Sequence, residues 1–257
     1  MDTADLLATR LTHTIEERIR TQPRTMQRMI GPSEIGNPCD HCLAARLAGW
    51  EKLEHAIPWL PFIGTAVHAE LERIFTTQRD ELTYLAEQRV TVGNLGDKPI
   101  TGSADLFIPK VRGIGSGGVN IDWKIVGNTT LDRVRREAHP GAQYEIQAHL
   151  YGLGWENAGE RVEQVAIAFL PRQKQRLTDA YWWHADYNPD IAHAALHRLN
   201  NLYSTLAVIH ANLGKEKTDH YISTLPRTEG CWDCKKYADY QPPKPASFNE
   251  ALNIPTT

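Results

Sequence analysis

Four cysteines in two widely separated pairs place the strongest constraint on the fold of this chain. Cys39 and Cys42 are spaced as CxxC, and so are Cys231 and Cys234. Disulfides are rare in a reducing cytoplasm, so metal ligation is the better interpretation of such pairs. A tetrahedral thiolate site built from both pairs would join the two ends of the chain across roughly 190 residues, a large entropic constraint on the unfolded state. Buried free thiols and a thioredoxin-like redox motif are weaker alternatives, the latter because neither pair follows a strand and opens a helix.

The composition is that of an ordinary globular protein. The chain has 257 residues, of which 41% are hydrophobic and 23% are charged, enough for one large domain or a domain with an appended lobe. It contains no run of about 18 apolar residues, so we expect no membrane span. The N-terminus is charged and lacks an apolar signal core, which favours a cytoplasmic location. The net charge is −3, so any binding of nucleic acid requires a local basic patch.

Hydrophobic periodicity and turn residues predict both helices and strands. We expect helices over residues 3–30, 43–50, 63–77, 140–157 and 189–213, and strands over residues 85–92, 100–108, 119–125, 162–170 and 178–186. The 63–77 helix should bury Val67, Leu71 and Ile74. Loops are expected at 31–42 and after 240, and GIGSGG at 113–118, which no Gly-Lys-Ser/Thr follows, predicts a hairpin turn rather than a phosphate loop. This order predicts an α/β fold with a central mixed β-sheet flanked by helices.

The strand expected at 119–125 is the most informative segment for function. Its apolar residues alternate with polar ones, and because successive side chains of a strand face opposite sides, Asp122 and Lys124 share one face. Their Cα atoms should lie about 7 Å apart. The plain alternative is the solvated polar face of an amphipathic edge strand, which is the better interpretation of so short a motif when it stands alone.

A second carboxylate, Asp105, lies on the preceding expected strand. A hairpin between residues 108 and 119 would place Asp105 beside Asp122. Two carboxylates repel each other unless a cation lies between them, and Mg²⁺ prefers oxygen ligands of this kind. Such an ion can activate water and stabilise the charge that develops on a phosphate. Lys124 could then orient or deprotonate that water, or neutralise the same charge.

Four segments together resemble the motifs of PD-(D/E)XK nucleases, and of their RecB-like branch in particular. Gly102–Asp105 and Ile121–Lys124 resemble the paired acidic motifs, Gly64–His68 is similar to the histidine motif, and Gln147–Tyr151 matches the QxxxY motif. The resemblance implies a restriction-endonuclease-like core, an Mg²⁺- or Mn²⁺-dependent deoxyribonuclease activity, and metal ligation by His68, Asp105, Asp122 and the carbonyl of Trp123. It also implies that Lys124 assists the attacking water and that Gln147 and Tyr151 shape the site and contact DNA.

Each of these residues has a simpler interpretation when taken alone. A single histidine such as His68 beside an apolar helix face is usually structural, and Gln147 and Tyr151, at i and i+4 on one helix face, are common boundary residues. Glu72, one turn after His68, could be a further ligand, although a solvent-facing carboxylate is the more common case. Chance agreement of all the motifs in the right order is much rarer, which favours the nuclease interpretation.

The same resemblance bears on the cysteines. AddB-type and CRISPR-associated relatives carry an iron–sulfur cluster on one early and three late cysteines, whereas this chain has two early and two late. The resemblance therefore implies a [4Fe–4S] cluster at Cys39, Cys42, Cys231 and Cys234, and Zn²⁺ suits the spacing equally well. His41, inside the first pair, is expected to be solvated because four cysteines already complete the site.

The function implied by the resemblance is that of a DNA exonuclease in phage or bacterial recombination and repair. It would act on DNA that is single-stranded or has free ends, and because the chain has no Walker A motif, a helicase or recombinase would be a separate partner. The resemblance covers roughly residues 31–240. We expect an N-terminal helical segment with the first cysteine pair at 1–60, a nuclease core at 61–215, and a C-terminal segment with the second cysteine pair and an irregular tail at 216–257. A catalytically silent DNA-binding or scaffolding module and an iron–sulfur redox protein are the alternatives.

Two basic stretches and several tryptophans are candidates for contacts with nucleic acid. The basic stretches are Arg133, Arg135 and Arg136, and Arg172, Lys174 and Arg176. Either stretch could neutralise phosphates, or be ordinary solubilising surface charge. Stacking on unpaired bases is open to Trp50, Trp59, Trp182 and Trp183, although core or boundary positions are more common for this residue.

Overall fold

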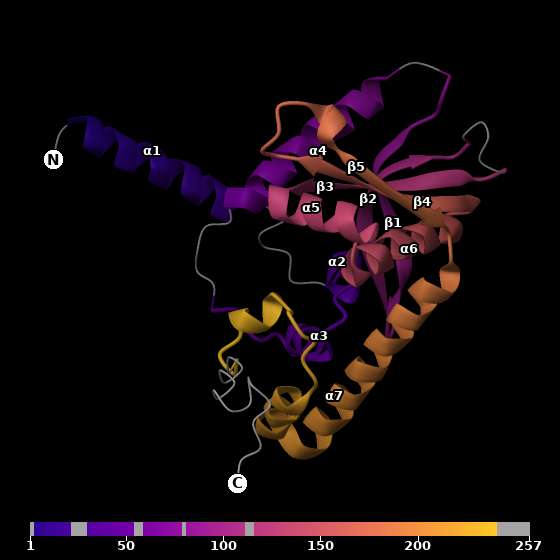
Figure 1. Ribbon diagram of the computed structural model, residues 1–257. Helices are drawn as coiled ribbons and strands as arrows, with labels where there is room; N and C mark the ends of the chain where they lie inside the picture. The colour runs from indigo at the N-terminus through magenta and orange to yellow at the C-terminus, as the bar shows by residue number, and fades with distance from the viewer. Residues whose placement is uncertain (1–2, 22–29, 54–58, 79–80, 111–115, 241–257) are drawn as a thin grey trace, which may run out of the picture.

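The computed structural model describes residues 3–21, 30–53, 59–78, 81–110 and 116–240, and in this part of the chain a five-stranded mixed sheet lies at the centre (Figure 1). The strands lie in chain order and are β1 (Leu85–Leu95), β2 (Lys98–Ile108), β3 (Gly118–Val126), β4 (Val162–Pro171) and β5 (Tyr181–Asp186). β3 and β4 run parallel, and the other neighbours run antiparallel. The prediction of an α/β fold with a mixed sheet flanked by helices is confirmed.

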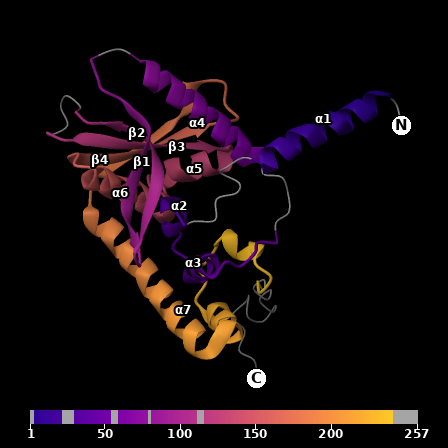
Figure 2. The same cartoon turned by 180° about the vertical axis from the view of Figure 1, so that it is seen from behind.

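Helices cover both faces of this sheet. They are α1 (Thr3–Arg20), α2 (Pro32–Ile35), α3 (Asp40–Leu47), α4 (Trp59–Thr77), α5 (Asn128–Glu137), α6 (Ala142–Asn157) and α7 (Pro189–Thr224), with short 3₁₀ turns at Leu177–Asp179 and Asp233–Lys236. α5, α6 and α7 pack on one face and α4 on the other, while α1 extends away from the sheet (Figure 2). Among the described residues, no helix combines the length and the apolar character needed to cross a membrane.

The alternation of side chains along the strands explains why the sheet is covered twice. Leu106 and Ile121 point toward α4, where they belong to one apolar cluster with Phe75. Phe107 points the other way, toward α6, and stacks on Trp155 with 4.5 Å between ring centroids. Since both faces carry apolar residues, both must be covered to remove them from water.

β3 is an inner strand, which excludes the edge-strand alternative for its polar residues. It lies between β2 and β4, and Asp122 is only 2% exposed. Its neighbour on the same face, Asn120, is also buried and accepts a hydrogen bond from Trp155 Nε1 at 3.2 Å. Buried polar groups require partners, so these side chains serve the interior of the protein rather than its contact with solvent.

The prediction for α4 is right in position and wrong in part of its buried face. No residue of α4 is fully buried: Leu71 packs against the sheet but is only partly buried, as is Val67. Ile74, however, is 40% exposed, and Phe75 lies against Trp123 instead, with 5.6 Å between ring centroids. Because α4 is the one described helix that packs on this face, its contact stripe is narrow and shields only the residues directly above the sheet.

Three helical segments differ from the expectation. The loop expected at 31–42 contains α2 and the start of α3, and the unexpected α5 has only two apolar residues, Leu131 and Val134, both buried. The last helix continues past residue 213 to Thr224 through a kink at Gly214, whose φ of 79° suits glycine. Residues 22–29 of the first expected helix, 111–115 of the expected turn and the tail from 241 lie outside the described residues.

Two segments that are far apart in the chain meet in a small lobe beside the sheet, which we call the cysteine lobe. It consists of residues 39–53, which include α3, the last turns of α7 and residues 225–240 (Figure 1). Arg198 of α7 holds the segment that leads into the lobe, because its guanidinium donates to the carbonyl oxygens of Ile35 and Asn37 and lies 3.8 Å from Asp40 Oδ1 at the start of α3. The four cysteines gather here, so the joining of the two ends that their spacing predicts is present.

Candidate active site and cysteine cluster

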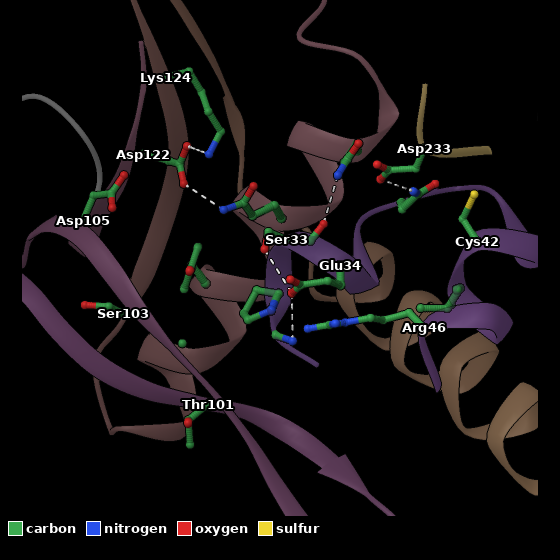
Figure 3. A pocket seen from close by; sticks show the side chains of 18 of the residues that line it. Ser33, Glu34, Cys42, Arg46, Thr101, Ser103, Asp105, Asp122, Lys124 and Asp233 are labelled. Carbon is green, nitrogen blue, oxygen red and sulfur yellow. Dashed lines mark hydrogen bonds and ion pairs between the residues drawn. The ribbon is translucent and has the colours of Figure 1, made fainter. Parts of the chain in front are cut away.

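The hairpin of β2 and β3 brings two carboxylates to one end of its ladder. Leu106 pairs with Ile121, and the next residues along the two strands are Asp105 and Asp122. Asp105 Oδ2 accepts a hydrogen bond from the backbone N–H of Trp123 at 2.7 Å, which fixes the carboxylate against β3. Both carboxylates line a single cavity (Figure 3). The structure thus brings together the pair that the sequence singles out.

Asp122 and Lys124 share one face of β3, as strand alternation predicts. Lys124 Nζ lies 2.5 Å from Asp122 Oδ2, and Gln147 Nε2 of α6 donates to Asp122 Oδ1 at 3.2 Å. Burial raises the pKa of the Asp122 carboxyl. Burial also opposes the charge on Lys124, but Asp122 and Asp105 outweigh this effect and raise the pKa of the ammonium. Lys124 is therefore a fixed cation at neutral pH.

His68 reaches the same site from α4. Its Nδ1 lies 3.1 Å from Asp105 Oδ1 and 3.7 Å from Glu87 Oε1. Burial works against a charged imidazole, but the contacts with Asp105 and Glu87 outweigh it and raise the pKa of His68 to about 9. A protonated His68 offsets the repulsion between the carboxylates, which is the electrostatic task that a divalent cation can also perform.

Glu87 is the member of this group that sequence reasoning missed. The register of β1 on β2 places it across from Asp105. Its φ of 49° is a left-handed conformation that non-glycine residues rarely adopt, and Ser103 Oγ donates to its Oε2 at 2.6 Å. Periodicity does not mark this residue, and only the strand pairing could have found it. Glu72, the carboxylate considered from the sequence, is exposed on α4 instead.

The donors at this site fit a divalent cation that prefers oxygen. One ligand atom each from His68, Glu87 and Asp105 lies within 4.8 Å of the others, and Asp122 adds a carboxylate to the same cavity. The carbonyl of Trp123 points to the same strand edge as its N–H group, which is bound to Asp105. Carboxylates, a backbone carbonyl and one imidazole suit Mg²⁺ or Mn²⁺, so the residues present fit the metal that the sequence implies.

α6 closes the site with Gln147 and Tyr151. Both side chains are mostly buried, lie one helical turn apart and line the cavity. A Cβ atom at Gly102 would lie 3.0 Å from Tyr151 Cε1 and 2.8 Å from Pro32 Cδ, so this glycine allows α2 and α6 to approach β2 closely. A Cβ atom at Gly64 of the histidine motif would meet no described atom within 4 Å, and packing does not explain that glycine.

The candidate active-site residues lie at one side of a cavity of about 950 Å³. Its lining continues along β2 to Thr101, passes α2 at Ser33, and reaches Cys42 and Tyr237 of the cysteine lobe (Figure 3). The candidate active site and the cysteine lobe therefore open onto the same space.

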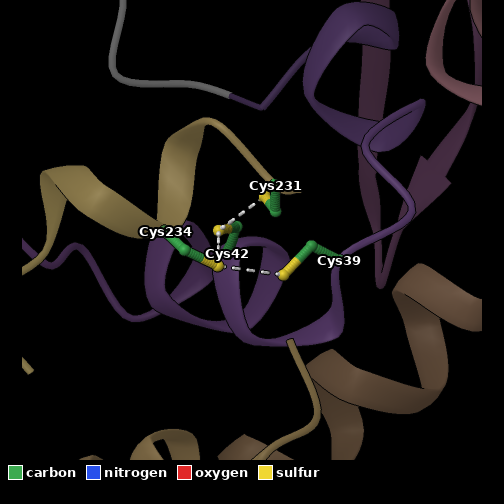
Figure 4. Close-up of side chains that lie close together, drawn as sticks. All are labelled: Cys39, Cys42, Cys231 and Cys234. Carbon is green, nitrogen blue, oxygen red and sulfur yellow. Dashed lines mark hydrogen bonds between the residues drawn. The ribbon is translucent and has the colours of Figure 1, made fainter. Parts of the chain in front are cut away.

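The four cysteine sulfurs form one compact group that can bind a metal (Figure 4). The Sγ–Sγ distances are 3.4 Å for Cys42–Cys234, 3.5 Å for Cys39–Cys234 and 3.6 Å for Cys42–Cys231. Hydrogen bonding from Cys42 lowers the pKa of the Cys39 thiol to about 4, whereas the same contact raises the pKa of Cys42 and burial raises that of Cys234. These opposed shifts of Cys39, Cys42 and Cys234 are typical of thiols that share a site, and a central cation would allow the three to ionise together.

His41 is buried rather than solvated, which corrects the expectation for the residue inside the first cysteine pair. Its Nε2 lies 2.9 Å from Asp239 Oδ2, which also accepts from Arg227 at 2.6 Å. Its Nδ1 lies 3.9 Å from Cys42 Sγ. The reason is that α3 begins at Asp40 and carries His41 into the lobe, where these partners satisfy the ring nitrogens.

The basic stretches and the four candidate tryptophans lie outside the lining of the cavity, and Trp50 packs against the cysteine cluster. The arginines at 133–136 are on α5, and the residues at 172–176 lie in the connection between β4 and β5. Trp183 is buried, whereas Trp59 and Trp182 are exposed. None of these is among the described residues that line the cavity, so any contact they make with nucleic acid lies outside it.

Comparisons with known proteins bear on the fold. No protein-family model and no curated protein matches the chain. Among solved structures, SSO0001 is similar with a TM-score of 0.51 at 14% identity, over 76% of this chain and 86% of that chain. An alkaline exonuclease (LHK-Exo) from Laribacter hongkongensis, solved alone and in complex with dAMP, has a TM-score of 0.48 at 10% identity, over 75% of this chain and 95% of its own. At 14% identity the likeness to SSO0001 shows a shared fold alone, and the likeness to LHK-Exo, with its lower TM-score, carries no argument.

Proposed function

We propose that this protein is a metal-dependent nuclease that hydrolyses phosphodiester bonds in DNA. The observation that carries the proposal is the convergence of Asp105, Asp122, Lys124 and His68, from two strands and a helix, at one side of a polar cavity. The resemblance to PD-(D/E)XK nucleases supports the same activity, because its motifs single out the same four residues.

In the proposed site, the side chains of His68, Asp105 and Asp122 and the carbonyl of Trp123 hold Mg²⁺ or Mn²⁺, and we add Glu87 to these ligands. When bound, such an ion supplies an activated water and neutralises charge at a phosphate. Lys124, with its raised pKa, stays protonated and stabilises the negative charge that develops on the phosphate. A permanently protonated lysine suits this role, whereas it is poorly suited to take a proton from the attacking water.

Two residues of α6 position the reacting groups in this proposal. Gln147 holds Asp122 in place through the hydrogen bond of 3.2 Å. Tyr151 lies one turn further along the helix beside Gly102, where it shapes the cavity wall that faces the DNA strand. Both are positioning residues, because they act on the ligands and the substrate rather than on the metal.

We further propose a structural metal at the cysteines, and the sulfur spacing favours a single tetrahedral ion. A zinc site with Zn–S bonds of about 2.3 Å has sulfur edges of about 3.8 Å, close to the 3.4, 3.5 and 3.6 Å of this cluster. The [4Fe–4S] cluster implied by the resemblance is a much larger body that would have to push the sulfurs apart. Metal analysis and a visible absorption spectrum of anaerobically purified protein decide between colourless zinc protein and brown iron protein.

The biological setting is the part of the proposal that rests on the resemblance. It is an exonuclease activity on DNA that is single-stranded or has free ends, in phage or bacterial recombination and repair, in the cytoplasm and beside a helicase or recombinase. The nuclease core would comprise residues 61–215, with the segments 1–60 and 216–257 joined through the cysteines. The cavity supports a nucleic-acid substrate, because its lining includes Arg46, Arg89 and Lys124.

Cleavage of end-labelled linear DNA and closed circular DNA tests the proposal. We expect cleavage of the linear DNA with Mg²⁺ or Mn²⁺, none with chelator, and recovery when the ion is restored; a resistant circle identifies an exonuclease. Asp105→Asn should be inactive, whereas Asp132→Asn, an exposed carboxylate on α5 outside the cavity, should be fully active. A folded parental protein that cuts neither DNA with any of these ions favours the silent DNA-binding module instead.

A further inference from the structure

The contacts between the four cysteine sulfurs form a row. Figure 4 shows the contacts running from Cys231 through Cys42 and Cys234 to Cys39, with Sγ–Sγ distances of 3.6, 3.4 and 3.5 Å in that order. All four are free thiols in this structure. Each contact of the row joins the segment that precedes the sheet to the segment that follows it, so the nearest partner of every sulfur comes from the distant part of the chain.

A row of four sulfurs divides into two contacting pairs in one way. Cys42 pairs with Cys231 and Cys39 pairs with Cys234, which are the outer contacts of the row. A bond across the middle contact, between Cys42 and Cys234, would leave the two sulfurs at the ends of the row to bridge a longer gap. A disulfide bond is about 2.05 Å long, so each outer pair has to close by about 1.5 Å, which rotation of the side chains can supply.

Hydrogen bonds that involve no sulfur also hold the two segments together. The N–H of Leu53 donates to the carbonyl oxygen of Lys236 at 2.7 Å. The indole Nε1 of Trp50 donates to Asp219 Oδ1, also at 2.7 Å. These contacts fix residues 39–53 against the last turns of α7 and the segment that follows it. We therefore expect the sulfurs to stay opposite one another when no ion holds them.

One of the outer pairs can be reached by a small molecule. Cys231 is the one cysteine of the four that is not buried, and its partner Cys42 lines the cavity. Cys39 and Cys234 are buried behind them. A small uncharged oxidant such as hydrogen peroxide therefore has access to the cluster through the pair of Cys42 and Cys231.

We propose that the cysteine cluster is a site of reversible oxidation by peroxides, at which disulfides Cys42–Cys231 and Cys39–Cys234 join the two segments covalently. In each pair, one thiolate attacks a peroxide oxygen, which gives a sulfenic acid and releases hydroxide. The second thiol attacks the sulfenic sulfur, which gives the disulfide and releases water. Each disulfide thus gives its electrons to one peroxide molecule. The proposal goes beyond the nuclease function and does not rest on it.

The pairing decides what oxidation does to the fold. Thiolates are the metal ligands, so the oxidised cluster gives up its ion. Bonds between the two segments keep the cysteine lobe closed and restrict the unfolded chain over a loop of roughly 190 residues. A bond within one CxxC sequence closes only a short loop and leaves the segments without a covalent link. The proposed pairs therefore replace the metal as the link between the segments.

A disulfide map of the whole protein tests the proposal. Protein as purified is treated with hydrogen peroxide, its remaining thiols are blocked with N-ethylmaleimide in denaturant, and it is digested with trypsin without reductant. Trypsin leaves the first cysteine pair in the peptide 29–46 and the second in the peptide 228–235. We expect the two peptides to be joined, and dithiothreitol to separate them. Separate peptides that each contain an internal disulfide overturn the proposal, and so do free thiols or sulfonic acids at all four positions.

Fragmentation of the joined peptides and one variant test the assignment of the pairs. We expect fragments that contain Cys42–Cys231 and Cys39–Cys234, and the opposite assignment overturns the row as the guide to pairing. Cys39→Ser should still give joined peptides through Cys42–Cys231, with Cys234 blocked by N-ethylmaleimide. An internal bond between Cys231 and Cys234 in this variant contradicts the proposal. If the variant does not fold, the map of the parental protein decides alone.

Calorimetry measures what the covalent link does for the fold. Oxidised protein that has lost its metal should melt at least about 6 °C above reduced protein stripped with chelator. Addition of dithiothreitol with chelator should abolish this difference. Equal melting temperatures of the oxidised and the reduced metal-free protein overturn the disulfides as a replacement for the metal. Neither the map nor the calorimetry uses DNA, so both outcomes are independent of the proposed nuclease function.

Discussion

The molecule contains two candidate cation sites that are assembled in opposite ways. The carboxylates of the active site, Asp105 and Asp122, lie across a single hairpin, and the sheet holds both strands in register. The cysteine site joins Cys42 to Cys231, which is 189 positions away in the sequence. The first site is supported by backbone pairing before any ion binds, whereas the second depends on closing nearly the whole chain. We therefore expect an ion at the first site to take part in chemistry and an ion at the second to hold the fold together.

The two sites also differ in the charged groups that surround their ligand atoms. In the active site, Lys124 and His68 already stand against the carboxylates at 2.5 and 3.1 Å. The cysteine sulfurs contact mainly one another, and three of the four residues are buried. Internal cations let the active site keep its geometry without metal, while the thiols lack that support. The predictions below separate the two sites on this basis.

The largest expected effect is the loss of DNA cleavage in a variant of the candidate active site that leaves the cysteine site intact. Asp105→Asn removes a metal-binding charge but keeps an oxygen that can accept from the N–H of Trp123. We expect DNA cleavage to fall by at least about a thousandfold, or about 4 kcal/mol of transition-state stabilisation. The melting temperature should stay within about 2 °C of the parental value, with the metal content of the cysteines unchanged. Parental cleavage by a folded Asp105→Asn protein contradicts the assignment.

The converse substitution, in the cysteine site, should lower the stability of the fold and leave DNA cleavage intact. Cys42 Sγ contacts both Cys231 and Cys234, so Cys42→Ser removes the central ligand. We expect bound metal to be lost and the free energy of unfolding to fall by about 3 kcal/mol or more, seen in calorimetry as a melting temperature about 6–12 °C lower. Protein that remains folded in the cold should still cut DNA. Full metal content with an unchanged melting temperature would show that the cysteines do not hold the two distant segments together. Asp105→Asn is the control in the same calorimetric experiment.

The sequence predicts these regions to different extents, for physical reasons. Strand alternation places Asp122 and Lys124 on one face, and the hairpin places Asp105 beside them, because both signals are local. Glu87 is beyond such reasoning, since its approach depends on the register of β1 against β2 and on a left-handed backbone that tertiary packing maintains. A local pattern thus finds residues on paired strands of one hairpin and misses those that a third element brings in.

The cysteine lobe shows the same limit in another form. The CxxC spacing predicts that the chain ends meet, but spacing along the chain does not set the distance across the lobe, so it does not choose between zinc and an iron–sulfur cluster. The burial of His41 follows from the start of α3 at Asp40 and from partners almost 200 positions away. α5 was missed because a helix with only Leu131 and Val134 as apolar contacts carries too weak a periodic signal.

An intermediate effect is expected at Glu87, where a change tests the residue that the sequence did not reveal. Glu87→Gln keeps the shape of the side chain and removes its charge. We expect Mn²⁺ affinity at the active site, followed by electron paramagnetic resonance, to fall by about 10- to 100-fold. In the metal-free protein, the pKa of His68 should fall below about 9, because one of the groups that raise it is lost. Glu72→Gln, an exposed carboxylate on α4, should change neither value. Parental Mn²⁺ affinity in Glu87→Gln removes Glu87 from the ligands.

The smallest effect is the pH dependence that His68 gives to the active site. The pKa of His68 is raised from 6.5 to about 9, and a metal ligand must lose its proton, so Mn²⁺ affinity should fall by up to about tenfold for each pH unit below 9. For the metal-free fold the sign is opposite: the charged imidazole stabilises it fully below about pH 6.5, and this contribution disappears as the pH rises through about 9.

Calorimetric titration of Mn²⁺ at pH 6.5 and at pH 9 measures this dependence, with the cysteine site left loaded. His68→Gln should flatten it, whereas His184→Gln, an exposed histidine on β5, should leave it intact. Equal Mn²⁺ affinity at the two pH values in the parental protein would mean that His68 is not a ligand. The metal ligands of the active site would then be carboxylates from the sheet alone, without a ligand from α4. The contrast with the cysteine site, whose ligands come from distant parts of the chain, would then be larger.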